Sequence, residues 1–412
     1  MSIIQVPRQN LIRCLTAANT LKSTYDAVLL KVSNNKLAIA TPALNSWLWQ
    51  EIDLAIKNPG LLPDTKEITR TAPLKSLLSI AKTGQTDLLQ MDFSSPNATR
   101  ITAGAKYSLS ARGYSAEHFP QKETKAETLC SIETRKLAQA ISKIHFTPDN
   151  QRAFSTLWRL KIDPEESKIT ITYTNGYLMF HIQETAEIHT DAPVEIILDT
   201  DCAPAIRHTL QQCQLEQSPK IHISVAPDKE TKQAIVFRSD SKLLYSVTAN
   251  TAFPDLDHYI DRYSADAEIQ TRLTMDKADL EAIIKRVLVT EAPHMSIKLD
   301  PPDTLIITAK NRDIGDLTLQ DYSAFVKGKP LTIGLNPHFL LYGARQIDAA
   351  KVTIDFINQN SPFRIKDANV LFVAMPMAVT YEAQEKANPE QEENTGYASE
   401  HCEVPKEYCE AV

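Results

Sequence analysis

Six cysteines and ten histidines are the side chains best suited to bind metals, attack substrates or carry protons. The cysteines lie far apart and form no C-x-x-C pair, and the histidines form no H-E-x-x-H pair. The spacing of a zinc site or a thiol redox site is therefore absent, and we expect no metal and no cofactor. A thiol or histidine site built around Cys202 or His208 is the enzymatic alternative that these residues leave open.

Motifs for phosphate binding and for a serine nucleophile are absent as well. The chain contains no G-x-G-x-x-G, no G-x-x-x-x-G-K-[ST] and no G-x-S-x-G. Only ten glycines occur among 412 residues, which leaves few positions for the close backbone turns that cradle nucleotides. The sequence thus favours a binding protein and predicts that it is not an enzyme.

Basic side chains on helical segments are the remaining candidates for a ligand site. The segments 72–84, 203–213 and 336–346 contain no Asp or Glu, although 51 acids in 412 residues would predict about four there. Such faces tolerate a phosphate backbone without binding it tightly, so we expect any contact with nucleic acid to be weak and sequence-independent. The alternative is that short helices packed on sheets simply have small polar faces. The predicted DNA-facing residues are Arg13, Lys75, Lys82, Arg135, Lys143, Arg207, Arg286 and Arg345.

These helical segments belong to a unit that occurs three times. Alternating apolar residues around polar turns predict β-hairpins at 29–42, 159–174 and 296–310, which gives a period of about 130 residues. A helical apolar stripe precedes each hairpin, and a second helix follows it. The stripes are Leu11/Leu15/Ala18, Leu137/Ile141/Ile144 and Leu280/Ile284/Val287. The predicted fold class is α+β, with three similar domains that each pack two helices on antiparallel sheets.

The predicted boundaries are 1–124, 125–258 and 259–381 for the three domains, followed by a tail at 382–412. The tail carries nine acids and two bases, so it accounts for the whole formal net charge of −7. Its Glu-rich composition and lack of periodicity predict disorder. We expect it to modulate partner binding without contacting DNA; the alternative is a solubilising appendage that has no partner. The longest apolar run has ten residues and no secretory signal is visible, so a cytoplasmic protein is expected.

Several phrases resemble the bacterial beta sliding clamp, the processivity subunit of DNA polymerase III. The most specific is Val370–Met377 with its Met-Pro-Met, and the likeness covers about residues 1–379. The others are the turn 174–179, the closing phrases 116–120 and 252–255, and the helix start 335–340. The resemblance implies a head-to-tail homodimer that closes a ring of six domains around duplex DNA, with helices inside. It also implies that the ring tethers the replicative polymerase. A clamp-like accessory protein that binds polymerase peptides without encircling DNA remains an alternative.

The resemblance further implies two kinds of contact site. A cleft between the second and third domains would take short linear peptides from the polymerase and the clamp loader. Its residues would be Phe154, Thr174, Gly176, Tyr177, Leu178, Met179, Pro254, His258, Tyr259, Val373, Ala374, Met375, Pro376 and Met377. The dimer interface would contain Tyr107, Leu109, Val287 and Leu288. Leu178, His258-Tyr259 and Ala378 depart from the arginine-containing family pattern, so a shifted peptide specificity is expected.

Overall fold

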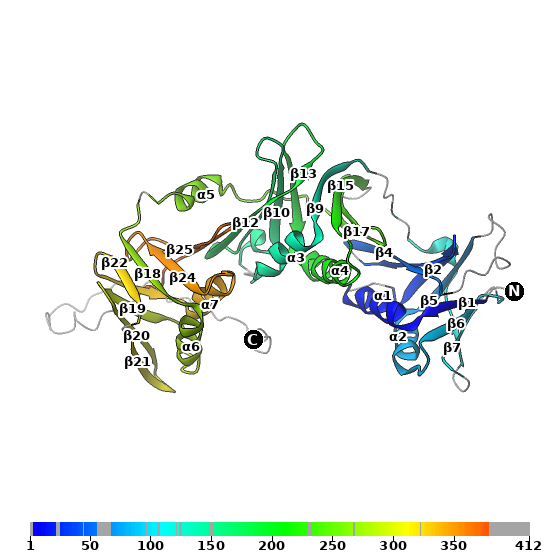
Figure 1. Cartoon of the computed structure of the whole chain (residues 1–412), viewed down its shortest axis with the longest axis horizontal. Helices are drawn as coiled ribbons and strands as arrows, with labels where there is room; N and C mark the ends of the chain where they lie inside the picture. Colours follow the sequence, from blue (N-terminus) through cyan, green and yellow to red (C-terminus); the bar gives the residue numbers. More distant parts are fainter. Residues whose placement is uncertain are drawn as a thin grey trace. The chain divides into compact units, whose positions relative to one another are not determined.

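Figure 1 shows a computed structural model of the chain. The structure describes residues 3–21, 25–43, 45–55, 67–95, 98–104, 108–120, 122, 126–147, 151–228, 232–266, 268–321 and 323–378. Internal contacts divide the chain into a compact unit, Met1–Met377, and a second unit, Ala378–Val412, of which only Ala378 is described. The predicted tail at 382–412 therefore lies outside the described residues. Within the described ranges, no helix is long and apolar enough to cross a membrane.

The first third of the compact unit opens with a strand and a helix. Leu11, Leu15 and Ala18 of that helix are fully buried, which confirms the stripe predicted from their spacing. The elements of this third are β1 (Ile3–Pro7), α1 (Arg8–Thr20), β2 (Ala27–Ser33), β3 (Lys36–Pro42), β4 (Ser46–Asp53), β5 (Ile68–Pro73), α2 (Leu74–Thr83), β6 (Leu88–Asp92), β7 (Ala98–Thr102), β8 (Ser108–Arg112) and the short 3-10 helix η1 (Ala116–His118).

The second third repeats this order. Leu137 and Ile141 are buried on its first helix, and Ile144 is buried directly after the helix ends. The elements are β9 (Thr128–Glu133), α3 (Thr134–Lys143), η2 (Ala153–Thr156), β10 (Leu157–Asp163), β11 (Lys168–Thr174), β12 (Leu178–Thr185), β13 (Glu187–Ile188), β14 (Val194–Asp199), η3 (Thr200–Cys202), α4 (Ala203–Leu215), β15 (Lys220–Asp228), β16 (Lys232–Arg238) and β17 (Lys242–Val247).

The last third is preceded by an additional helix, α5, that the sequence pattern did not predict. The final helix of this third is capped by Asn336, whose Oδ1 accepts a hydrogen bond from the backbone N–H of His338 at 2.9 Å. Pro337 occupies the first helical position. The elements are α5 (Asp257–Ser264), β18 (Thr271–Asp276), α6 (Lys277–Leu288), β19 (Met295–Asp300), β20 (Thr304–Asn311), β21 (Gly315–Asp321), β22 (Phe325–Gly328), β23 (Leu331–Leu335), α7 (Pro337–Arg345), β24 (Lys351–Phe356), β25 (Phe363–Lys366) and β26 (Val370–Ala374).

Two nine-stranded sheets join the thirds to one another. In one, β4 of the first third pairs with β17 of the second, and in the other, β12 of the second third pairs with β26 of the third. The orders are β13-β9-β15-β16-β17-β4-β3-β2-β5 and β14-β10-β11-β12-β26-β25-β24-β18-β22. Two four-stranded sheets complete the set, β1-β6-β7-β8 and β21-β20-β19-β23. The pairs between named strands are all antiparallel in the described residues, as expected from the many short turns.

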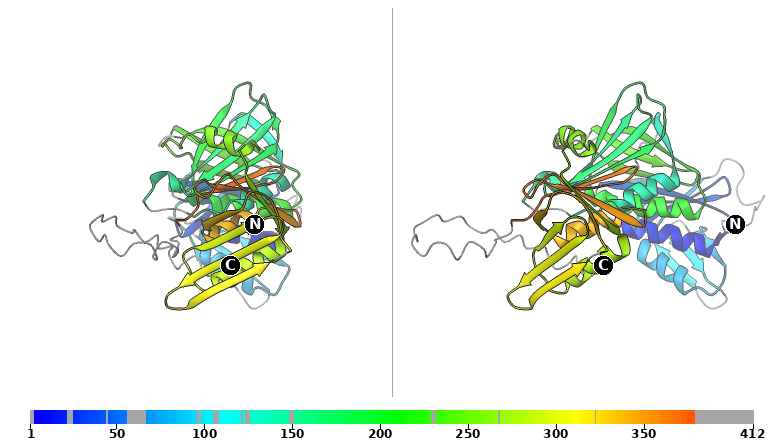
Figure 2. Two further views of the ribbon diagram at one scale, coloured as in Figure 1. Left: turned by 90° about the vertical axis from the view of Figure 1, so that its left-hand side faces the viewer. Right: turned by 60° about the vertical axis from the view of Figure 1, so that its left-hand side comes forward.

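The two faces of each nine-stranded sheet carry different cores. Leu48 and Leu244 belong to the large core that includes residues of the helices, whereas their neighbours Trp47 and Tyr245 belong to a small cluster of strand residues with Phe119. This follows from the twofold alternation of side chains along a strand. The helices pack in pairs, α1 with α2, α3 with α4, and α6 with α7. Figure 2 shows the paired helices lying against the sheets. The predicted α+β fold class is confirmed, whereas the division at 124, 258 and 381 stays a prediction.

Candidate functional site

An apolar cleft of about 300 Å³ lies where the second third meets the last. Every side chain that lines it is uncharged, and four are aromatic. The lining residues are Phe154, Thr174, Gly176, Tyr177, Leu178, Met179, Pro254, Leu256, Tyr259, Tyr263, Pro362, Val373, Ala374 and Met375. An exposed apolar groove of this kind is suited to apolar side chains of a binding partner.

Strand pairing across the two thirds forms the floor of the cleft. Leu178 of β12 is paired with Ala374 of β26, and the backbone N–H of Met375 continues the ladder by donating to the carbonyl of Tyr177 at 2.8 Å. The residues of the turn 174–179 and the closing strand therefore meet, although about two hundred residues separate them in the sequence. Met375 remains 43% exposed at the mouth of the cleft.

The turn between β11 and β12 is fixed by its own side chains. The Thr174 hydroxyl donates to the carbonyl of Leu178 at 2.7 Å and accepts from the Gly176 N–H at 2.9 Å. The Asn175 Oδ1 accepts from the N–H groups of Tyr177 and Leu178, both at 3.0 Å. Gly176 adopts a φ of +85°, and a Cβ there would overlap the guanidinium of Arg152. The sequence Thr-Asn-Gly thus sets the shape of this wall.

A cation lies beside the apolar lining. The Arg152 guanidinium stacks on the Tyr177 ring at 4.0 Å from its centroid, and its Nη1 donates to the carbonyl of Asn175 at 3.3 Å. A guanidinium in this position gives the rim of the otherwise uncharged cleft a positive charge.

Helix α5 forms the opposite wall through Leu256, Tyr259 and Tyr263. Its buried face packs Ile260 and Tyr263 on Met179 of β12 and on Leu371 and Val373 of β26. Tyr259 is not part of this apolar cluster and is 51% exposed. Because α5 rests on strands of both thirds, its position defines how wide the cleft is.

The structure brings together eleven of the fourteen cleft residues expected from the resemblance; His258, Pro376 and Met377 are not among the lining residues. His258 places its ring edge-on to Tyr259, with 5.9 Å between centroids, while the N–H of Met377 donates to the carbonyl of Gly334 in β23. The structure adds Leu256, Tyr263 and Pro362. Leu256, Ile260 and Tyr263 follow a helical apolar period, which is the signal that could have revealed two of the additions and α5 itself.

The predicted DNA-facing cations differ in how available they are. Five of them are exposed: Arg13, Lys75, Lys82, Arg135 and Arg286. Arg345 is partly exposed, and Lys143 is bound to Asp348 with 2.6 Å between Nζ and Oδ2. Arg207 is half-buried and donates to the carbonyls of Ile141 and Ile144 at 3.2 and 3.1 Å, so it caps the end of α3.

The residues predicted for a dimer interface also differ in whether their side chains are exposed to a partner. Leu109 lies on β8, an edge strand of its four-stranded sheet, and Leu288 is partly exposed at the end of α6. Val287 is fully buried in the core of its own chain, so its side chain offers no surface to a partner. Tyr107 lies outside the described residues.

The enzymatic alternative at Cys202 has little chemical support. Burial raises the pKa of its thiol to about 12, and its Sγ donates to the carbonyl of Asp199 at 2.8 Å. The thiolate is the reactive form, so this residue is inert at neutral pH. A second cavity, of about 450 Å³ beside Trp47 and Trp49, is lined by polar groups such as Lys31 and Lys242 that form ion pairs. In the described residues, no group of three or more His, Cys, Asp or Glu side chains could hold a metal ion.

Sequence comparisons connect the chain to a replication protein. The family model described as DNA polymerase III beta subunit, C-terminal domain, matches residues 267–378. The beta sliding clamp of Streptococcus pneumoniae serotype 4 is 22% identical over 280 residues, which cover 66% of this chain and 69% of that protein. The beta sliding clamp of Lactococcus lactis is 27% identical over 142 residues, covering 33% of this chain and 36% of that protein.

Solved structures have the same fold over nearly the whole compact unit. The DNA polymerase III subunit beta of Pseudomonas aeruginosa matches with a TM-score of 0.77 at 18% identity, covering 92% of this chain and 100% of that one. The DNA polymerase sliding clamp of Bacillus subtilis matches with a TM-score of 0.78 at 13% identity, covering 92% and 99%.

Proposed function

We propose that this chain, a divergent relative of the bacterial beta sliding clamps, is a DNA sliding clamp that encircles duplex DNA and tethers the replicative DNA polymerase. One observation carries the proposal: a threefold repeat, in which paired helices are packed on sheets that continue from one third into the next, matches solved clamps over 92% of the chain. A ring built this way confers processivity by topology, without a reaction of its own. The proposed protein is therefore not an enzyme, and it acts where DNA is replicated, in the cytoplasm.

DNA would be held loosely inside the ring. The exposed cations Arg13, Lys75, Lys82, Arg135 and Arg286 supply scattered positive charge on the helices, which favours contact with phosphates and carries no sequence information. Because Arg207 is committed to the carbonyls of α3, it contributes less than the exposed cations. The second helices α2, α4 and α7 contain no acids, which keeps repulsion low.

Two copies would close the ring head to tail. Edge strand β8 of one copy offers unpaired backbone groups, and pairing with an edge strand in the last third of another copy would satisfy both edges. Leu109 and Leu288 are the expected apolar contacts, together with Tyr107. If a twofold rotation relates the two copies, the same contact forms at both ends, which closes the ring and leaves neither edge unpaired.

The apolar cleft would take short linear peptides from the polymerase and the clamp loader. Its uncharged lining and aromatic walls favour aliphatic and aromatic side chains, and the guanidinium of Arg152 beside Tyr177 favours an acidic group at the rim. One cleft of this kind allows different partners to use the same site in turn.

Solution mass and primer extension test this proposal. We expect a sedimentation mass of twice the 46.0 kDa of one chain, and longer products when the chain is added to polymerase and loader on singly primed circular DNA. A chain that binds the polymerase but stays monomeric and leaves product length unchanged would instead be an accessory protein that does not encircle DNA.

A further inference from the structure

Helix α5 is too short to hold its own shape. It has eight residues, of which only Ile260 and Tyr263 are buried, whereas isolated helices shorter than about 12–15 residues are marginal in water. Nevertheless α5 carries Tyr259 and Tyr263, which form one wall of the apolar cleft. Contacts outside the helix must therefore fix its position.

Arg159 of β10 fixes the first residue of α5. Arg159 is only 5% exposed, and its Nη2 donates to the Oδ1 of Asp257 at 2.8 Å. Its Nη1 lies 3.5 Å from the carboxylate of Glu195. The hydrogen bond from Arg159 holds the pKa of Asp257 below its usual value, so this carboxylate is charged and paired at neutral pH. This contact ties α5 to the second third.

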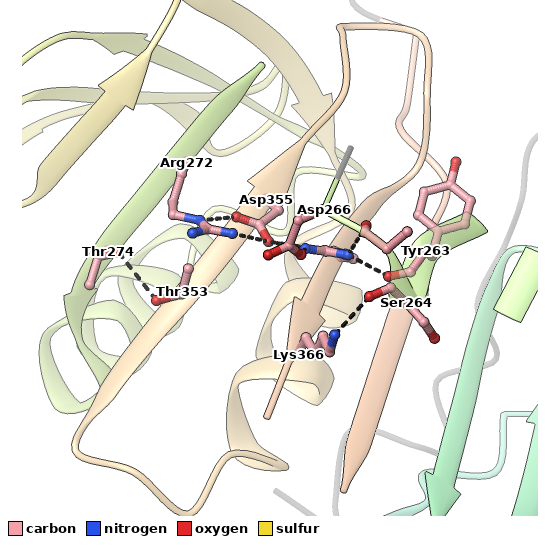
Figure 3. Close-up of polar contacts among 10 residues, drawn as sticks. Tyr263, Ser264, Asp266, Arg272, Thr274, Thr353, Asp355 and Lys366 are labelled. Atoms are coloured by element: carbon pink, nitrogen blue, oxygen red, sulfur yellow. Dashed lines mark hydrogen bonds and ion pairs between the residues drawn. The ribbon is translucent and has the colours of Figure 1, made fainter. Parts of the chain in front are cut away.

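Arg364 of β25 fixes the other end of α5, where Tyr263, Ser264 and Asp266 lie; these three are labelled in Figure 3. Arg364 is 3% exposed, and its Nη1 donates to the carbonyls of Tyr263 and Ala265, both at 2.6 Å. Its Nη2 pairs with the carboxylate of Asp266, just beyond the helix. The Nζ of Lys366 adds a hydrogen bond to the carbonyl of Ser264 at 2.7 Å. The end of α5 is thus bound to the last third by charge-assisted hydrogen bonds, which are stronger than neutral ones.

A neighbouring arginine shares the buried partner of Arg364 but not its contact with α5. The Nε of Arg364 donates to Asp355 at 2.9 Å, and Arg272 of β18 donates to the same carboxylate at 2.5 and 3.1 Å. The side-chain hydrogen bonds of Arg272 within the described residues go to Asp355, and Figure 3 shows Arg272 on the side of Asp355 away from Tyr263. Substituting Arg272 therefore changes only the contact with Asp355 in the sheet, whereas substituting Arg364 also changes the contact with α5.

We propose that Arg159 and Arg364 are positioning residues of the peptide cleft: they clamp the two ends of α5, one from each third, and so hold Tyr259 and Tyr263 where a bound peptide needs them. The inference rests on the proposed role of the cleft as a peptide site. When a binding-competent conformation is only partly populated, the apparent dissociation constant rises by the inverse of that fraction. Releasing either end of α5 lowers the populated fraction and weakens peptide binding without removing any residue that lines the cleft.

The test compares Arg364→Lys and Arg159→Lys with the matched control Arg272→Lys. Lysine keeps the charge but loses the planar fork that reaches several acceptors at once. The probe is a fluorescein-labelled pentapeptide ending in Leu-Phe, chosen for the apolar lining, and its affinity is measured by fluorescence anisotropy. We expect about tenfold weaker binding for the first two variants, equivalent to a competent fraction of about one tenth, and a change within about twofold for the control. Equal loss in all three variants would overturn the proposal.

Hydrogen exchange of the α5 amides separates this inference from the proposed function. We expect faster exchange at 257–264 in Arg364→Lys and Arg159→Lys, and wild-type exchange there in Arg272→Lys. If the wild-type chain fails to bind the peptide, the proposed function of the cleft is wrong, while the exchange still tests the clamping of α5. Unchanged α5 exchange in Arg364→Lys would refute the clamping. If Arg364→Lys fails to fold, Asp266→Asn removes the charged partner of Arg364 at the end of α5, and its 69% exposed side chain makes this change mild. Faster exchange at 257–264 in this variant supports the clamping, and wild-type exchange contradicts it.

Discussion

Replacing Met375 with lysine should abolish most peptide binding to the apolar cleft. Met375 lies at the mouth, next to Tyr177, and none of the other lining residues is charged. The backbone hydrogen bond from Met375 to the carbonyl of Tyr177 does not depend on the side chain. The substitution therefore changes the chemistry of the cleft and leaves its strand pairing in place.

The size of the effect follows from exposure and charge. Met375 is 43% exposed, and fully burying a methionine contributes about 1.5–3 kcal/mol, so a peptide that covers the rest gains about 1 kcal/mol there. A lysine loses this gain and also brings an unpaired ammonium under the peptide, which costs a further ~1–3 kcal/mol. The nearby guanidinium of Arg152 adds repulsion. At 1.4 kcal/mol per factor of ten, the dissociation constant should rise by about 30-fold or more.

Fluorescence anisotropy with the labelled pentapeptide measures this change. Leu215→Lys is the matched control, because it converts a 64% exposed apolar residue outside the cleft into the same cation and should leave affinity unchanged. Met377→Lys should have a smaller effect than Met375→Lys, since Met377 does not line the cavity. Wild-type affinity in Met375→Lys, or an equal loss in Leu215→Lys, would show that peptides do not bind in this cleft.

Two further substitutions and one change of pH test the packing around α7, the contact of the helices with DNA, and the ion pairs that anchor α5. Gly343→Ala should lower the free energy of unfolding in urea, because a Cβ would lie 2.4 Å from Cδ1 of Phe372 and 2.8 Å from Cδ1 of Ile365. The loss of stability from overpacking, about 1–3 kcal/mol, should outweigh the roughly 1 kcal/mol gained from the higher helix propensity of alanine. A variant more stable than the wild type would contradict this expectation. Arg135→Glu should weaken DNA binding and reduce the slope of log affinity against log salt by about 0.9 for each phosphate that is no longer neutralised, whereas Lys168→Glu on β11 should change neither. Arg159, with Lys161 and His181 as lesser contributors, holds the pKa of Asp257 below 3.8, and Arg364, with Lys366 and Arg272, does the same for Asp266. The ion pairs of these two carboxylates should therefore contribute their full stabilisation above pH 3.8 and lose it as the pH falls through the lowered pKa values. Hydrogen exchange of the α5 amides, measured as a function of pH, would detect this loss.

Local periodicity predicted the repeated elements of the fold well. The turns at 34–35, 164–167 and 301–303 lie between alternating strands, and the structure forms β2/β3, β10/β11 and β19/β20 there. These signals are local because a strand's alternation and a helix's stripe reflect which face is buried. The order of the nine-stranded sheets could not be predicted in this way, since it depends on β4 meeting β17 and β12 meeting β26.

The candidate site was only partly predictable for the same reason. The polar residues Asp257, His258 and Asp261 lie around the predicted domain boundary at 258, and no helix was predicted there, although Leu256, Ile260 and Tyr263 already had a helical spacing. Arg207 caps α3 through contacts with residues more than sixty positions away in the sequence. The composition of the segment 203–213 could not reveal such contacts. The burial of Val287 agrees with the predicted apolar stripe Leu280/Ile284/Val287, whereas its place in a dimer interface came from the resemblance alone.

Retention on circular DNA tests the encircling of duplex DNA most directly. The chain would be loaded on a nicked circular plasmid with the clamp loader, passed over a gel-filtration column at moderate salt, and assayed again after one restriction cut. A ring held by topology stays with the circle and slides off the linear product, because its direct contacts with phosphates are weak and screened by salt. Equal retention on circular and linear plasmid, or release from the uncut circle, would contradict the proposal that this protein encircles DNA.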